Sequence, residues 1–423
     1  MKAQRSKLKA QSSKQKRRAW RDAWPGPLQK DRSRKKEDGR LSYKVRFVDP
    51  GKNYRMIQEE IDAAYREVME KGDLILRGQL KCFEENLAAF VGTKYAVGLN
   101  SGYDALHISM ILAGVKAGDE VIVPAHTFLA TASAVVNAGG TPVLVDVASD
   151  YNIDVRRIEE KITPRTKAII PVHLNGRPAD MEKVMALAKK HKLVVVEDAC
   201  QSLGAAFQGK KVGSFGLTGC WSFYPFKILG GYGDGGAITT NDQEAVRMAT
   251  LLRYNGEDRE TGEYYYHGFT CLLDNLQAAF LEVKLRHLPR WIDRRRAIAA
   301  RYQAGLSGIH ALILPHFPDP RMEEVFQNYV IRTPRRDALF EHLKAAGVET
   351  LIHWRKPYYA HQALGMDGQR FAETESISRE VISLPMNVEM SDEEVDYVIQ
   401  SVRSFFRAQG SKLKGQSSKL MIS

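Results

Sequence analysis

The sequence predicts an α/β protein with a largely parallel central sheet and a second, smaller domain. Between residues 104 and 197, short apolar runs alternate with segments of helical spacing, the pattern of successive β-α units. The runs VIV, VLV, AIIPV and LVVV are apolar throughout, which is typical of strands covered on both faces of a sheet. A length of 423 residues suits a large domain joined to a smaller one.

The pattern places each element in turn along the chain. Strands are expected at residues 120–124, 142–147, 168–172, 193–197 and 237–240. Helices are expected at residues 54–70, 104–113, 128–137, 155–161 and 181–190. A long helix over residues 275–305 leads into the second domain, for which we expect a strand at 328–332 and helices at 337–346 and 392–406.

Four segments follow from this organisation. We expect a disordered basic extension at 1–40, a large domain at 41–290, a small C-terminal α+β domain at 291–407 and a disordered basic tail at 408–423. Residues 6–14 (SKLKAQSSK) and 411–419 (SKLKGQSSK) match at eight of nine positions. We interpret both ends as a duplicated basic sequence that is not part of the fold. A basic tether is the alternative reading of these ends.

The net charge of +12 does not describe the folded part. Residues 1–40 contain fifteen Lys or Arg and four Asp or Glu, residues 403–423 contain five and none, and the segment between them is therefore at −4. A folded surface of this charge makes nucleic acid an unexpected partner. No apolar run approaches the ~18 residues of a membrane span, no secretory signal is recognisable, and the four cysteines have neither disulfide nor metal spacing. We expect a cytoplasmic protein without a metal.

Two side chains are candidates for chemistry. Asp198 ends an apolar strand, and ligand sites in parallel sheets lie outside the carboxyl ends of strands. Lys227 follows the aromatic segment SFYPF, where desolvation would lower the pKa of its amine and make it nucleophilic. Taken singly, each has an ordinary alternative: Asp198 as a helix cap or surface acid, and Lys227 as a lysine that extends its amine to solvent.

Two glycine-containing segments complete the pattern. GGYGDGG at 230–236 formally contains G-x-G-x-x-G, but a strand rather than a helix follows it, so it does not indicate a dinucleotide site. We interpret it as a loop that lets backbone approach a ligand near Lys227. NSGY at 100–103 precedes a helix, and a helix N-terminus with free amides binds phosphate. An ordinary capped helix start is the alternative.

The order of these features resembles fold type I PLP-dependent enzymes, and specifically the DegT/DnrJ family of sugar-nucleotide aminotransferases. The similarity runs from about residue 47 to 406 and rests on AGDEVIVPAHTFLATASAV, PVLVDV, TPRTKAIIPVHLNGRPADM, VVVEDACQSLGA, WSFYPFKILGGYGDGGAITTND, LDNLQAAFLEVKL and SLPMN. It implies a large domain with a mostly parallel sheet of the seven-stranded type, flanked by helices, and a homodimer with active sites shared between subunits.

The resemblance also assigns residues. Lys227 matches the lysine that holds PLP as a Schiff base and moves the proton, and Asp198 matches the partner of the pyridine nitrogen. The remaining cofactor-binding positions are Ser101, Gly102, Tyr103, Phe128, Gln201, Ser222 and Thr270. Phe128 would stack on the ring, and Gln201 would contact the ring face or its 3-hydroxyl side.

Some positions depart from the family pattern. Tyr103 stands where N-S-G-T has threonine, and Asn175 stands where tyrosine is common. Where the partner subunit usually supplies an asparagine and an arginine (G-x-N-x-R-L-D), this chain has Thr270 and Leu272. These changes bear on substrate handling more than on the lysine chemistry.

The implied reaction is amination of a nucleotide-linked keto sugar, with L-glutamate as donor. Residues 347–359 (GVETLIHWRKPYY) resemble members that act on 3-keto sugars, so we favour C3 over C4 and place His353 in the sugar site. A structural histidine is the alternative for His353. Two other functions stay open: a PLP-dependent sugar dehydratase or lyase, against which the lysine counts, and an inactive regulatory family member.

Overall fold

The computed structural model describes residues 43–315, 319–366 and 368–420, with side chains to residue 407. The predicted extension at 1–40 lies outside the described residues. The chain divides into two compact units, of which the larger comprises residues 43–358 and 369–423. In the smaller one the described residues lie within 359–368, where the short 3-10 turn Gln362–Leu364 forms. The following description concerns the larger unit.

A seven-stranded sheet in the order β1-β9-β8-β5-β4-β2-β3 forms the centre of the large unit. Its strands are β1 Tyr95–Leu99, β2 Glu120–Pro124, β3 Thr141–Val145, β4 Thr166–Ile169, β5 Val194–Asp198, β8 Thr218–Ser222 and β9 Gly236–Thr240. Neighbours pair in parallel from β3 to β8, whereas β9 runs antiparallel to both β8 and β1. The prediction of a mostly parallel sheet is confirmed.

Helices cover both faces of this sheet because its strands are apolar on both sides. On one face, α4 (Gly78–Val91) and the first half of α9 (Asn275–Leu306) bury Phe83, Leu87 and Leu281 against β1, β8 and β9, and α7 (Met181–His191) packs near β5. The further helices are α5 (Gly102–Leu112), α6 (Leu129–Asn137) and α8 (Gln243–Leu252). The fold is therefore a layered α/β arrangement, as expected for fold type I.

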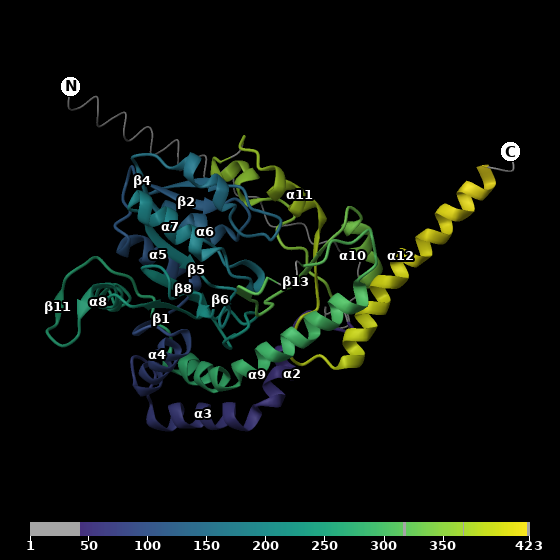
Figure 1. Ribbon diagram of the computed structural model, residues 1–423. Helices are drawn as coiled ribbons and strands as arrows, with labels where there is room; N and C mark the ends of the chain where they lie inside the picture. The colour runs from purple at the N-terminus through teal and green to yellow at the C-terminus, as the bar shows by residue number, and fades with distance from the viewer. Residues whose placement is uncertain (1–42, 316–318, 367, 421–423) are drawn as a thin grey trace, which may run out of the picture. The chain divides into compact units, whose positions relative to one another are not determined.

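A second apolar core forms around the other half of α9. It joins Tyr302 of that helix to β13 (Tyr329–Arg332), β14 (Val381–Leu384), α10 (Arg336–Ala345) and α12 (Asp392–Leu420). Figure 1 shows α9 as a long green helix that passes from α3 (Gln58–Lys71) and α4 to α10 and α12. The predicted boundary at 290/291 falls inside α9, next to Pro289, and the division into domains stays a prediction.

The expected elements agree with the structure except in two segments. The helix expected at 54–70 is interrupted at Ile57, between α2 (Pro50–Met56) and α3. Residues 155–161 were expected to form one helix, and the structure has two 3-10 turns instead, Val155–Arg157 and Glu159–Lys161. The Asp154 carboxylate caps the first of these turns by accepting from the Arg156 N–H at 3.1 Å. Helix α12 is continuous to Leu420 and thus includes most of the predicted tail at 408–423. Across the described residues, no helix is both long and apolar enough to cross a membrane.

A buried carboxylate holds the loop between β5 and β8. Glu197, fully buried next to Asp198, accepts three backbone N–H groups at 2.7–2.8 Å, from Gly213, Phe215 and Gly216. It also lies 3.0 Å from His173 Nε2. The His173 Nδ1 accepts from a backbone amide, so its Nε2 carries the hydrogen and donates to Glu197. The carboxylate therefore uses both oxygens to satisfy four buried donors.

Replacement of Glu197 by glutamine tests this interpretation. A glutamine has one acceptor oxygen and an NH₂ group, so Glu197→Gln leaves buried donors unsatisfied and should lower the free energy of unfolding by about 1–3 kcal/mol. Denaturant unfolding of the apoprotein measures the change. Glu244→Gln on the exposed side of α8 is the matched control, expected within ~0.5 kcal/mol of wild type. Equal stability of the two variants would contradict the role of Glu197.

Candidate active site

The carboxyl edge of the sheet brings together residues from three distant parts of the chain. Asp198 ends β5, Ser222 ends the adjacent parallel strand β8, and the N-terminus of α5 packs against both. A Cβ atom at Gly102 would lie 2.7 Å from Ser222 Cβ and 2.8 Å from Cys200 Sγ. Only glycine fits at the first residue of α5, so the helix end can approach the end of β8 closely.

Lys227 lies in the loop that connects β8 to the antiparallel strand β9. Its N–H donates to the Tyr224 carbonyl at 2.8 Å, and its side chain is partly buried. Burial lowers the pKa of the Lys227 amine, and the neighbouring Cys200 and Asp198 groups only partly oppose this effect. Burial also raises the pKa of the Cys200 thiol well above its usual value. The loop thus presents an amine of increased nucleophilicity.

Asp198 is buried and held at both carboxylate oxygens. Its Oδ2 accepts from the Thr131 hydroxyl at 2.8 Å, and its Oδ1 accepts from the Cys200 N–H at 3.3 Å. Thr131, in α6, is itself 3.0 Å from the Thr127 hydroxyl. The sequence analysis missed Thr131, although it lies in the quoted segment AHTFLATASAV, because only the fold brings α6 to the end of β5. These contacts fix the direction of the carboxylate.

The start of α5 has the properties of a phosphate-binding helix end. Ser101 is its N-cap, and the Ser101 hydroxyl accepts from the Asp104 N–H at 3.0 Å and donates to the Asp104 carboxylate at 2.7 Å. The amides of Gly102 and Tyr103 are in the first turn, where helix amides have no partner within the helix. The Tyr103 hydroxyl is turned toward α6 and contacts the Asn137 amide. Because its hydroxyl is turned away, Tyr103 offers a ligand at this helix end its backbone amide rather than its side chain.

Two further predicted cofactor residues, Phe128 and Gln201, differ in exposure and in how they are held. Phe128 precedes α6 and is 59% exposed, which is unusual for a large apolar side chain and leaves its ring accessible to a ligand. Gln201 is anchored, since its Oε1 accepts from the Asn175 N–H at 3.0 Å. Asn175 has a left-handed backbone (φ 58°) and accepts at Oδ1 from Asn328 at 3.0 Å. Asn175, one of the positions that depart from the family pattern, thus helps to hold Gln201 in place.

Thr270 is an exposed residue whose hydroxyl donates to Asn255 Oδ1 at 2.8 Å. Among the described residues it makes no hydrogen bond to the other predicted cofactor positions. Leu272 forms a β-bridge with Leu99 at the end of β1, just before the α5 cap. The role of Thr270 in a neighbouring subunit's site stays a prediction.

His353 belongs to an aromatic cluster near Lys227. Its Nδ1 lies 2.9 Å from the Ser383 hydroxyl, and burial together with the Lys227 charge lowers its pKa to about 4. Trp354 stands between His353 and His126, with ring centroids 5.7 Å and 5.1 Å away. Burial, with the charges of His353 and Arg332, lowers the pKa of His126 to about 3. Both imidazoles are therefore neutral near pH 7.

His126 was not among the predicted site residues. It follows β2 by two positions, and the rule that ligands bind at the carboxyl ends of strands could have identified it.

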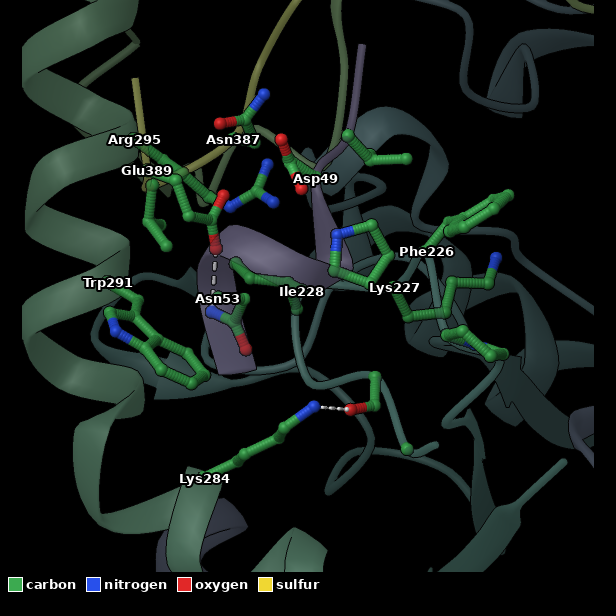
Figure 2. Close-up of a pocket in the computed structure, with 16 residues that line it drawn as sticks. Asp49, Asn53, Phe226, Lys227, Ile228, Lys284, Trp291, Arg295, Asn387 and Glu389 are labelled. Atoms are coloured by element: carbon green, nitrogen blue, oxygen red, sulfur yellow. Dashed lines mark hydrogen bonds between the residues drawn. The ribbon is translucent and has the colours of Figure 1, made fainter. Parts of the chain in front are cut away.

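A small cavity lies on the other side of the Lys227 loop. Its lining includes Phe226, Ile228, Lys284, Arg295 and Glu389. Figure 2 shows the Lys284 amine donating to the Gly230 carbonyl, while the Lys227 side chain is directed away from Arg295 and Glu389. Burial lowers the pKa of Lys284 to about 8 and that of Arg295 to about 10. Lys284 thus supports the loop at Gly230, whereas Arg295 donates to the carbonyls of Phe326, Gln327 and Met386. The described residues contain no group of three or more His, Cys, Asp or Glu side chains that could hold a metal ion.

Comparison with known proteins agrees with this geometry. The model of the DegT/DnrJ/EryC1/StrS aminotransferase family matches residues 55–403. A pleiotropic regulatory protein of Geobacillus stearothermophilus is 40% identical over 371 residues, covering 86% of this chain and 99% of that protein. The dTDP-3-amino-3,4,6-trideoxy-alpha-D-glucose transaminase of Streptomyces venezuelae is 39% identical over 366 residues, covering 86% and 96%.

Solved structures give the same result. The crystal structure of S. venezuelae DesV in complex with a ketimine intermediate has a TM-score of 0.83 and 40% identity, over 86% of this chain and 98% of that chain. The likeness covers both the sheet and the second core, because it extends over nearly the whole described chain. The chain therefore belongs to the DegT/DnrJ/EryC1/StrS aminotransferase family and is a PLP-dependent sugar-nucleotide aminotransferase.

Proposed function

We propose that this enzyme transfers the amino group of L-glutamate to C3 of a nucleotide-linked keto sugar, as a homodimer with shared active sites. The observation that carries the proposal is the buried amine of Lys227, of lowered pKa, next to the fixed carboxylate of Asp198. C3 is favoured because the S. venezuelae relative is named for a 3-amino sugar and residues 347–359 resemble such enzymes. A 4-keto sugar is the next candidate.

The residues present fit PLP. The excluded Cβ at Gly102 leaves the α5 amides beside the Ser222 hydroxyl, a cradle of donors suited to a phosphate group. The exposed ring of Phe128 supplies a stacking surface, and Asp198 supplies a negative charge for a protonated pyridine nitrogen. When bound, PLP supplies a conjugated ring that accepts electrons from the reacting carbon.

The chain's own groups then divide the work. The Lys227 amine, whose pKa is lowered by burial, is able in its neutral form to take a proton from the carbon of the amino donor and, once protonated, to deliver one to the sugar carbon. Thr131 keeps the Asp198 carboxylate in one orientation, so its charge does not have to reorganise during the reaction. Anchored Gln201 limits movement on the ring side of the site.

On the sugar side, the neutral imidazoles of His353 and His126 offer hydrogen bonds without charge. A charged histidine there would repel Lys227 and raise the cost of a protonated amine, whereas the pKa values of about 4 and about 3 exclude that charge at neutral pH. Trp354 lies between the two rings and presents an apolar face suited to a sugar ring.

The two alternatives differ in what they require of Lys227. A PLP-dependent sugar dehydratase would fit a histidine at this position, and the chain has lysine. An inactive regulatory member is the second candidate, because one relative is named a pleiotropic regulatory protein. The convergence of Lys227, Asp198 and Ser222 at one sheet edge supports catalysis, since a chain without activity has no need of this arrangement.

Replacement of Lys227 tests the assignment of the reactive amine. Lys227→Ala should abolish the visible absorbance of bound PLP and lower turnover at least about 10²-fold, since general acid–base work by one group is typically worth that much. Turnover of a keto-sugar nucleotide with L-glutamate measures the loss. Lys161→Ala, at an exposed position, should behave as wild type. A Lys227→Ala protein that still turns over would disprove the assignment.

Asp198 and Thr131 should act as a pair. Asp198→Asn removes the charge without changing the shape and should lower turnover on the order of 10²-fold, as is usual when a group that stabilises developing charge is removed. Thr131→Val removes only the 2.8 Å hydrogen bond and should fall between wild type and Asp198→Asn. The double variant should be no slower than Asp198→Asn alone. Additive losses would show that Thr131 does not act through Asp198.

His353 should affect the sugar half of the reaction only. His353→Phe removes one neutral hydrogen-bonding group and should raise KM for the sugar nucleotide about 3- to 10-fold, the range for one such bond. The half-reaction with L-glutamate should keep its rate in stopped-flow absorbance. His310→Phe, an exposed position, is the control. A slowed glutamate half-reaction with unchanged sugar KM would remove His353 from the sugar site.

A further inference from the structure

One buried side chain, Gln327, binds the backbone on both sides of Lys227. Its Oε1 accepts from the Ile228 N–H at 2.7 Å, and its Nε2 donates to the Phe226 carbonyl at 2.9 Å. Gln327 is only 8% exposed and comes from the segment before β13, about a hundred positions further along the chain. A backbone N–H requires an acceptor and a carbonyl requires a donor, so only this orientation of the amide satisfies both groups.

The two bonds fix the backbone angles of Lys227. The Phe226 carbonyl belongs to the peptide plane that precedes the Lys227 Cα, and the Ile228 N–H belongs to the plane that follows it. Because peptide planes are rigid, φ and ψ of Lys227 are the only rotations between them. A single planar amide bonded to both planes therefore sets the direction in which the Lys227 side chain leaves the loop.

We infer that Gln327 is a positioning residue for Lys227, which orients the lysine amine toward bound PLP. The inference rests on the proposed role of Lys227 and extends it. Lys227 lies outside both β8 and β9, so no strand pairing holds its backbone, and its own N–H makes a turn bond to Tyr224. Gln327 thus supplies what a strand ladder would supply elsewhere.

The backbone that carries Gln327 is itself held rigidly. Arg295 Nη1, from α9, donates to the carbonyls of Phe326, Gln327 and Met386 at 3.0, 3.3 and 2.8 Å. A Cβ atom at Gly176 would lie 2.6 Å from the backbone nitrogen of Gln327, so the backbone around Gly176 is in close contact with the backbone that carries Gln327. Phe326 has a left-handed backbone (φ 51°), a conformation that such packing must enforce.

The same segment also supports Gln201. Asn328 follows Gln327, and its Nδ2 donates to Asn175 Oδ1, while the Asn175 N–H donates to Gln201 Oε1, both at 3.0 Å. The adjacent amides Gln327 and Asn328 therefore hold two predicted cofactor residues from one rigid piece of backbone. A shift of this segment would move Lys227 and Gln201 together.

A second glutamine, Gln277, also binds the loop and serves as a matched control. Gln277 Oε1, from α9, accepts from the Tyr232 N–H at 2.9 Å. This bond holds the glycine-rich part of the loop, past the Gly230 carbonyl that Lys284 binds (Figure 2). Gln277→Leu and Gln327→Leu each remove one glutamine that orders the loop, but only the second touches the peptide groups that flank Lys227.

The test compares Gln327→Leu, Gln277→Leu and wild type in two readouts. Hydrogen exchange of the Ile228 amide is measured on full-length protein without PLP, and the rise of visible absorbance is followed after PLP is added. Gln327→Leu should lose protection at Ile228 and take up PLP on the order of 10- to 100-fold more slowly, the effect of a misplacement of about 1 Å. Gln277→Leu should keep Ile228 protected and bind PLP at nearly the wild-type rate.

Two results would overturn the inference: wild-type protection and PLP uptake in Gln327→Leu, or equal losses in both variants, which would indicate general loosening of the loop. If Gln327→Leu does not give folded protein, Gln327→Asn replaces it, because an amide one methylene shorter cannot reach both peptide groups. Failure of wild-type protein to take up PLP would refute the proposed function instead, while exchange at Ile228 would still decide whether Gln327 holds the loop.

Discussion

Burial of the Lys227 amine is the constraint on which the rest of the site depends. An amine withdrawn from water favours its neutral form, and the neighbouring Cys200 and Asp198 groups only partly oppose this effect. Three neighbouring groups are neutral near pH 7. Burial keeps the Cys200 thiol protonated, and His353 and His126 have pKa values of about 4 and about 3. At neutral pH these three neighbouring groups therefore add no charge to the site.

Strained backbone surrounds this site. Among the non-glycine residues with a left-handed backbone, Asn175, Phe326 and Trp354, at φ 51–58°, lie in segments that carry or support predicted site residues. Each such conformation costs about 1–3 kcal/mol and persists only where packing enforces it. In this chain the enforcing contacts are visible: Gly176 lies against the backbone of Phe326, and Arg295 binds three carbonyls around it. Stability supplied by the cores thus maintains a fixed active-site geometry.

Sequence patterns predicted what is periodic or local. The parallel strands β2 to β5, most of the helices that were expected and the carboxyl-edge position of Asp198 follow from apolar runs and their alternation. Strands β1 and β8 and helices α4 and α8 were not expected. The helix predicted at residues 155–161 was wrong because apolar spacing alone does not distinguish an α-helix from two successive 3-10 turns. Thr131 and Gln327 were not identified, because each acquires its role through a contact with residues far away in the chain. His126 was not identified either, although its position just after the carboxyl end of β2 is visible in the sequence. Lys227, by contrast, could be named from its order relative to Asp198 and the glycines.

The most direct measurement of the central claim is an absorbance spectrum of the purified protein with PLP, before and after L-glutamate is added. The account predicts a visible band that requires Lys227, bleaches with L-glutamate and returns when the keto-sugar nucleotide is supplied. A protein that stays colourless with PLP would contradict it, and the departures at Tyr103, Thr270 and Leu272 would then mark a chain that has lost its cofactor and serves as a regulator.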